Sequence, residues 1–186
     1  GLEFVWVNHH DSHLGCALGA SEKSKALLFS FDGSGDGESA AIALVSSRKS
    51  QYNILARVPA ADSLGNLYSA ITKRYNFKVS QHEGKITGLA AYGSYSGAYD
   101  VLKSHVEVRN GVPEILYIKH LKRRLATRAL RHLGLSKNSI ISLDEIAQLA
   151  SSRTVNYPDL AFAVQKVLEE SIIEVVDFWI GKTAIS

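Results

Sequence analysis

Three side chains that can bind a metal ion stand close together in the first part of the sequence: His9, His13 and Asp32. The two histidines are four residues apart, so in a helix they share one face and can hold one ion. Asp32 follows residues 26–31, an apolar run that is typical of a strand. Imidazole and carboxylate ligands suit iron, zinc or manganese, so ligand type does not choose the metal. Solvated or hydrogen-bonded histidines are the alternative to a metal site.

A glycine-rich segment, D-G-S-G-D-G-E, begins at Asp32. A dinucleotide fingerprint is excluded because residues 39–45 predict a strand where that motif needs a helix. A calcium loop is disfavoured because its twelfth position, which needs a bidentate acid, is Ala43. Two interpretations remain, a phosphate cradle in which Gly33 and Gly35 let backbone N–H groups approach an anion, and a tight hairpin that needs positive φ. Three glycines and two acids in six residues favour the cradle.

A second glycine-bearing segment, Q-H-E-G-K-I-T-G-L-A-A-Y-G, occupies residues 81–93 and predicts a helix. Glycines at positions 84 and 88 lower helix propensity, so we expect something to approach the backbone there. Lys85 can meet a phosphate or a sugar, and Glu83 can accept a hydrogen bond from a hydroxyl. The alternative is close helix packing with a surface Lys–Glu pair.

The remaining pattern predicts the scaffold that positions these groups. Strands are predicted at 4–7, 26–31, 39–45 and 52–58, a hairpin at Asn110-Gly111, and helices at 9–20 (capped by Asn8), 64–75 (capped by Ser63), 119–132, 144–150 and 158–180. Residues 182–186 resemble the beginning of a further strand. The 119–132 helix is basic but lacks interleaved aromatic residues, so we do not expect it to bind nucleic acid.

The composition is that of a globular protein, with 46% hydrophobic and 21% charged residues among 186. A net charge of +3 is too small to imply a polyanionic partner. Cys16 is the sole cysteine, which excludes an internal disulfide and favours a reducing, cytoplasmic location. No apolar run approaches the roughly 20 residues of a membrane span, so no membrane partner is expected. The sequence contains no methionine, and we expect it to be a section of a longer protein.

Four blocks in this order resemble the O-carbamoyltransferases of nodulation-factor and antibiotic biosynthesis. The blocks are N-H-H-D-S-H, F-D-G-S-G-D-G-E-S, S-L-G-N-L-Y-S-A-I-T and H-E-G-K-I-T-G-L-A-A-Y-G. The helix D-L-A-F-A-V-Q-K-V-L-E-E is similar to the family's helix before its glycine-rich nucleotide-binding strand. The resemblance spans nearly the whole chain, although residues 94–155 carry little of it.

The resemblance implies an α/β fold, a fragment of an actin/sugar-kinase-like (ribonuclease-H-like) ATPase with a glycine-tipped β-meander packed with helices. Residues 1–22 would then be the end of the first lobe and the crossing helix, and residues 23–186 the start of the second lobe. The family's leading strands, its later glycine-rich strand, a further acidic metal ligand and its adenylate-forming domain have no counterpart in this sequence. We therefore expect an incomplete active site, weak metal binding and no activity from this chain alone.

The resemblance also implies a chemistry, the ATP-dependent transfer of a carbamoyl group from carbamoyl phosphate, through carbamoyl-adenylate, to a small-molecule alcohol. The expected cofactors are ATP and a divalent metal, Fe(II), and a homodimer is compatible with the resemblance. The matching residues are His9, His13 and Asp32 as metal ligands, Gly33, Gly35, Gly84 and Lys85 beside the nucleotide, and Glu83 and His10 as catalytic candidates, with the role of His10 left open.

Two other functional classes remain open at the level of sequence. A non-catalytic nucleotide-binding module would keep the glycine-rich turn but would not need His9, His13 and Asp32 together. A relative of the tRNA threonylcarbamoyltransferases would use the basic helix on RNA. The acceptor alcohol is not specified by any motif.

Overall fold

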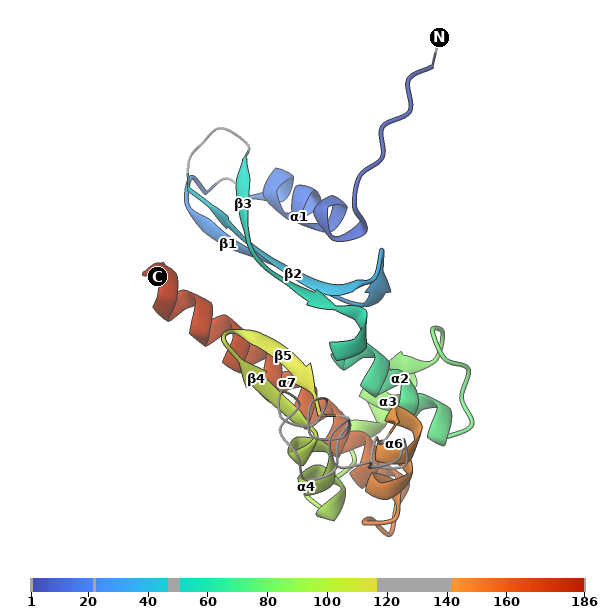
Figure 1. Cartoon of the computed structure of the whole chain (residues 1–186). Helices are drawn as coiled ribbons and strands as arrows, with labels where there is room; N and C mark the ends of the chain where they lie inside the picture. The colour runs from blue at the N-terminus through green and yellow to red at the C-terminus, as the bar shows by residue number, and fades with distance from the viewer. Residues whose placement is uncertain (1, 22, 47–50, 117–141, 186) are drawn as a thin grey trace, which may run out of the picture.

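The computed structural model describes residues 2–21, 23–46, 51–116 and 142–185. The predicted basic helix at 119–132 lies outside the described residues. The fold is α/β, with two small antiparallel sheets and several helices (Figure 1). In the described part of the chain, no helix is long and apolar enough to cross a membrane.

A three-stranded antiparallel sheet lies between two helices, one on each face (Figure 1). The strands are β1 (Ala26–Gly35), β2 (Glu38–Val45) and β3 (Tyr52–Pro59), and the helices are α1 (His9–Ala20) and α7 (Tyr157–Thr183). Leu28 and Ala41 of the sheet pack with Leu14 of α1, whereas Ile42 packs with Trp179 of α7 on the opposite face. Because side chains alternate along a strand, β1 directs every second residue from Leu28 towards α1.

The middle of the chain, residues 60–116 and 142–151, packs along α7. Its elements are a 3₁₀ turn (Ala60–Asp62), α2 (Leu64–Arg74), α3 (Glu83–Ala90), α4 (Gly97–Ser104), β4 (Val106–Arg109), β5 (Val112–Ile115) and α6 (Leu143–Ser151). Its core is formed by aliphatic side chains that are almost fully buried: Leu67, Ile71, Ile86, Leu102, Ile115, Ile146, Leu160, Val164 and Val167. This core anchors α2 and α3, and α2 contacts β1 (Figure 1).

Most of the predicted elements are confirmed, because their signals are local. Asn8 and Ser63 cap α1 and α2 through their side chains, and the predicted helix at 9–20 has the predicted bounds. Two strands of the larger sheet, β2 and β3, match their predicted ranges to within one residue, whereas β1 continues to Gly35. Asn110 and Gly111 both have positive φ in the turn of the β4–β5 hairpin, as their sequence predicts.

The predicted strand at 4–7 is wrong. These residues form no regular structure, and their side chains are exposed, with Trp6 at 96% of its full accessibility. An apolar strand is held by neighbouring strands, and none of the described strands pairs with this segment.

The predictions for the ends of two helices were also wrong. Residues 182–185 do not begin a strand, because α7 continues to Thr183 and Ala184 then adopts a left-handed conformation with φ of 51°. The predicted helix at 81–93 is shorter, since α3 covers only Glu83–Ala90. Helix α4 was not predicted from the sequence.

Candidate metal centre

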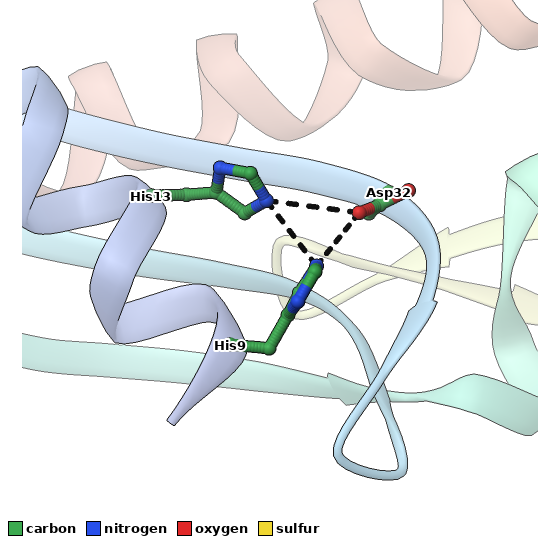
Figure 2. A group of neighbouring side chains, drawn as sticks. All are labelled: His9, His13 and Asp32. Carbon is green, nitrogen blue, oxygen red and sulfur yellow. Dashed lines mark hydrogen bonds and ion pairs between the residues drawn. The ribbon is translucent and has the colours of Figure 1, made fainter. Parts of the chain in front are cut away.

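The first turn of α1 is fixed by its cap. The Asn8 Oδ1 atom accepts hydrogen bonds from the backbone N–H groups of His10 (2.9 Å) and Asp11 (3.2 Å). Such a cap satisfies donors that have no partner inside the helix, and it makes His9 the first helical residue. His9 and His13 are therefore one turn apart on the same side of α1 (Figure 2).

His9, His13 and Asp32 converge on one point, as the sequence predicted (Figure 2). The Asp32 Oδ2 atom lies 2.7 Å from His9 Nε2 and 3.7 Å from His13 Nε2, and the two Nε2 atoms are 3.2 Å apart. Ligand atoms that bind one ion at about 2.1 Å, with angles of about 90° to 110°, are themselves separated by roughly 3 to 3.5 Å. The separation of the two Nε2 atoms lies in this range, and the other two separations differ from it by about 0.3 Å or less, so small movements of the side chains would give the spacing of metal ligands.

The Asp32 carboxylate is held in orientation by its own turn. Asp32 Oδ1 accepts a hydrogen bond from the Gly33 N–H (2.6 Å), which directs Oδ2 towards the histidines. The hydrogen bond from His9 is the largest cause that lowers the pKa of Asp32, followed by that from Gly33, while burial opposes them. Asp32 is therefore ionised at neutral pH, the state that a metal ligand requires.

The third imidazole, His10, lies beside this cluster and is buried in the protein. Its side chain is fully buried, and its Nδ1 atom lies 2.8 Å from the Ser30 hydroxyl on β1. Its Nε2 atom has no hydrogen-bond partner among the described residues. The ring is packed edge-on against His9, with centroids 5.2 Å apart. A catalytic role for His10 stays a prediction, and this burial gives it no contact with solvent.

The glycines of the β1–β2 turn have different neighbours. Of these glycines, Gly37 alone has positive φ (82°). The preceding residue, Asp36, also has positive φ (51°), so Asp36 and Gly37 form the hairpin turn. A Cβ atom at Gly35 would lie 2.2 Å from two ring atoms of His9. Gly33 is close to Gly65 of α2, where a Cβ would lie 2.8 Å from the Gly33 Cα. The absence of a side chain at Gly35 therefore makes room for the His9 ring. The predicted role of Gly35 next to a phosphate stays a prediction.

A pocket of about 630 Å³ adjoins the cluster, because Asp32 and Gly33 line it as well. The other lining residues come mostly from β1, β2, α2, α3 and α7: Phe31, Ser39, Ala40, Leu64, Gly65, Tyr68, Ser69, Ser80, Glu83, Thr87, Pro113, Gln165, Leu168 and Ile172. Two of the predicted functional segments, the glycine-rich turn and the start of α3, therefore meet in one cavity.

Glu83 enters this pocket as a carboxylate held by two donors. Its Oε1 atom accepts hydrogen bonds from the Ser69 hydroxyl (2.9 Å) and the Ser80 backbone N–H (2.7 Å). Burial raises the pKa of Glu83, but the hydrogen bonds, that from the Ser80 N–H first, outweigh it and the pKa is lowered. Gly84 and Lys85 are not among the lining residues. The Lys85 Nζ atom instead lies 5.1 Å from the centre of the Phe77 ring.

Two charged residues that the sequence analysis did not single out hold α1 in place. Asp36 Oδ2 accepts a hydrogen bond from the His9 backbone N–H (2.8 Å). Arg57 of β3 donates to Asp11 of α1 (2.7 Å) and to Glu38 of β2 (2.6 Å). Spacing along the sequence could not reveal these contacts, because the partners are far apart. The one available sign of a role for Arg57 was that it is the only charged residue in β3.

The chain is similar to proteins from archaea and bacteria. It is 29% identical over 184 residues to the uncharacterized protein MJ1051 of Methanocaldococcus jannaschii, covering 94% of this chain and 31% of that protein. It is 27% identical over 171 residues to the nodulation protein NolNO of Sinorhizobium fredii, covering 92% of this chain and 22% of that protein. The uncharacterized protein sll1178 of Synechocystis sp. is 39% identical over 89 residues, which are 48% of this chain and 14% of that protein.

The chain thus spans less than a third of the length of each of these relatives. The family model described as "Carbamoyltransferase N-terminus" matches residues 2–185, which include the cluster of His9, His13 and Asp32, the glycine-rich turn and α3. Because this match covers nearly the whole chain, the chain belongs to the carbamoyltransferase N-terminus family.

Proposed function

We propose that this chain is part of an ATP-dependent O-carbamoyltransferase, which moves a carbamoyl group from carbamoyl phosphate, through carbamoyl-adenylate, to an alcohol. One observation carries the proposal: His9, His13 and Asp32 converge beside a pocket that Asp32 also lines. A metal centre next to a cavity of nucleoside size is what such a transfer requires. Family membership supports the reaction class.

The proposed metal ligands are His9, His13 and Asp32, and the proposed ion is Fe(II). Two histidines and one carboxylate on one side of an ion, with further positions open, are typical of non-haem Fe(II). The three side chains remain 38% (His9), 52% (His13) and 42% (Asp32) exposed, so substrate can reach the open positions. When bound, the ion would stabilise negative charge on the carbamoyl oxygen and on the departing phosphate.

The pocket is the proposed site of the adenosine part of the nucleotide. Its volume of about 630 Å³ lies within the range of small-molecule sites. The Tyr68 hydroxyl lies 2.9 Å from the Thr87 hydroxyl and 3.0 Å from Gln165 Oε1, so polar groups for the base or the ribose are already ordered.

The charges around the pocket indicate where the phosphates would lie. Asp32 and Glu83 line it, and the described lining includes no lysine or arginine. Two carboxylates repel a phosphate group, so the phosphates need the cation held by the histidines. Gly33, which lines the pocket next to Asp32, is the proposed phosphate-side glycine because it has no side chain to block the approach of a phosphate, while its N–H is bound to Asp32 Oδ1. Gly35, Gly84 and Lys85 stay predictions as nucleotide-binding residues.

In the proposed transfer, the alcohol oxygen forms a bond to the carbamoyl carbon and the bond between that carbon and the AMP phosphate oxygen breaks. The alcohol proton must pass to a base. Glu83 is the proposed base because it is a carboxylate that lines the pocket.

For the fold, we propose a fragment of an actin/sugar-kinase-like ATPase. Residues 1–22 would form the end of one lobe and the crossing helix, and residues 23–186 the start of the second lobe. Support comes from the β1–β2–β3 meander with its turn at the pocket and from α1 packed across one face of it.

The experiment that tests this function is a calorimetric titration of AMP into the chain, with and without Fe(II). We expect tighter binding in the presence of the ion, and binding about tenfold weaker in Gln165→Ala, which loses a hydrogen-bonding group of the pocket. Gln148→Ala, on the exposed side of α6, is the matched control and should bind like the wild type. AMP affinity that is independent of both Fe(II) and Gln165 would contradict the proposal.

A further inference from the structure

We propose that the turn between β1 and β2 sets the position of the His9 imidazole, with Asp36 as a positioning residue and Gly35 as the space that the ring occupies. This inference rests on the proposed metal-binding role of His9. It gives the glycine-rich turn a task within the chain, in addition to any contact with a phosphate.

The first observation concerns the backbone of α1. The first N–H groups of a helix have no partner inside it. Asn8 serves the N–H groups of His10 and Asp11, and the His9 N–H is instead bound by Asp36 Oδ2 at 2.8 Å. Asp36 thus completes the cap from a position 27 residues along the chain. A carboxylate is well suited to this place, since a helix N-terminus carries partial positive charge.

The conformation of the turn aims this carboxylate. Asp36 and Gly37 both have positive φ (51° and 82°), and they connect Gly35 and Glu38, which pair across the two strands. Aspartate, asparagine and glycine tolerate this left-handed conformation better than other residues do. The sequence D-G at the tip therefore supplies both the turn and the acceptor for the His9 N–H.

The second observation concerns the His9 ring itself. A Cβ atom at Gly35 would lie 2.2 Å from His9 Cγ and Cδ2 and 2.8 Å from His9 Cβ. The overlap extends to the root of the side chain, so the ring cannot avoid a methyl group by a small movement of its outer edge. Any side chain at position 35 would rotate the imidazole away from Asp32, whose Oδ2 atom is 2.7 Å from His9 Nε2.

The helix has other anchors, which separate positioning of His9 from the stability of the fold. Leu14 is fully buried against the sheet, Asn8 keeps its own cap, and Arg57 of β3 binds Asp11 of α1. Loss of the Asp36 carboxylate should therefore leave α1 on the sheet while its first residue loses a fixed orientation.

The test compares Asp36→Gly, which keeps the turn but removes the acceptor, with Asp36→Asn, which keeps both. Two readouts are used: the imidazole nitrogen and carbon NMR signals of His9 in the metal-free chain, and the dissociation constant for Co(II) as a spectroscopic probe of the site. In Asp36→Gly we expect shifted His9 signals and about tenfold weaker Co(II) binding, the usual effect of losing a group that orients a metal ligand. In Asp36→Asn both readouts should stay close to wild type, and Gly35→Ala should change both at least as much as Asp36→Gly.

The two readouts separate this inference from the proposed function. If the wild-type chain does not bind Co(II), the metal site fails, but the metal-free NMR signals still decide whether Asp36 orients His9. If the His9 signals of Asp36→Gly match those of the wild type, the inference is overturned. It is overturned as well if Asp36→Asn is as defective as Asp36→Gly, because the acceptor would then not be the relevant property.

Discussion

The two glycine-bearing segments of this chain use glycine in different ways. In the β1–β2 turn, Gly35 makes room for the His9 ring, and the neighbouring Gly33 is packed against Gly65 of α2. In α3, a Cβ atom at Gly84 or Gly88 would have no described atom outside its own helix within 4 Å. The space beside Gly33 and Gly35 is therefore occupied by other parts of the chain, whereas the space beside Gly84 and Gly88 is open.

This difference teaches how a glycine in a sequence should be interpreted. Both segments predict a close approach to the backbone, but only the structure identifies what approaches. At Gly35 the approaching group is an imidazole of the proposed metal site, so we expect a substitution there to weaken metal binding more directly than nucleotide binding. At α3 nothing described fills the space, and a ligand can still enter it.

The largest effect that tests the comparison is expected for Gly65→Ala. The added methyl would lie 2.8 Å from the Gly33 Cα and 3.1 Å from the Asp32 carbonyl oxygen. These are backbone atoms that cannot turn aside, so we expect a loss of about 2 to 3 kcal/mol in the free energy of unfolding. Urea unfolding measures it, and a variant as stable as the wild type would show that the turn is not closely packed.

A somewhat smaller loss is expected for Arg57→Ala, which leaves Asp11 and Glu38 without their shared partner. The Arg57 side chain is only 29% exposed, so we expect a loss of about 2 kcal/mol in the free energy of unfolding. Lys73→Ala is the control, since its ion pair with Asp144 is largely exposed and should be worth less than about 1 kcal/mol. Equal losses for Arg57→Ala and Lys73→Ala would show that the ion pairs of Arg57 contribute no more to the stability of the fold than an exposed ion pair does.

The smallest effect, and of opposite sign, is expected for Gly84→Ala and Gly88→Ala. Each should stabilise the protein by about 0.5 to 1 kcal/mol, because alanine favours a helix over glycine and meets no described neighbour. If a nucleotide approaches the start of α3, only Gly84→Ala should also weaken AMP binding. Destabilisation by either substitution would show that the space in α3 is not open.

The part of the site that was predicted from sequence follows local rules. The spacing of His9 and His13, the Asn8 cap and the strand that ends at Asp32 are each determined within a few residues. Because α1 packs on the sheet that contains β1, these local features bring the three side chains together.

What could not be predicted depends on contacts between distant segments. Asp36 and Arg57 reach α1 from 27 and 46 residues away, so no spacing rule finds them. The burial of His10 also depends on which face of α1 meets the sheet. Residues 4–7 were predicted as a strand because their composition is right, but a strand exists only when another pairs with it.

The central claim, that His9, His13 and Asp32 hold one metal ion, is tested most directly by metal analysis of the chain after anaerobic loading with Fe(II). We expect about one ion per chain for the wild type and for His82→Ala, which removes an imidazole outside the cluster. In His13→Ala, the loss of one of three ligands should weaken binding at least about tenfold, so that less iron is bound than in the wild type in equilibrium dialysis at the same free Fe(II) concentration. Equal iron content in the wild type and His13→Ala, or none in either, would contradict the account.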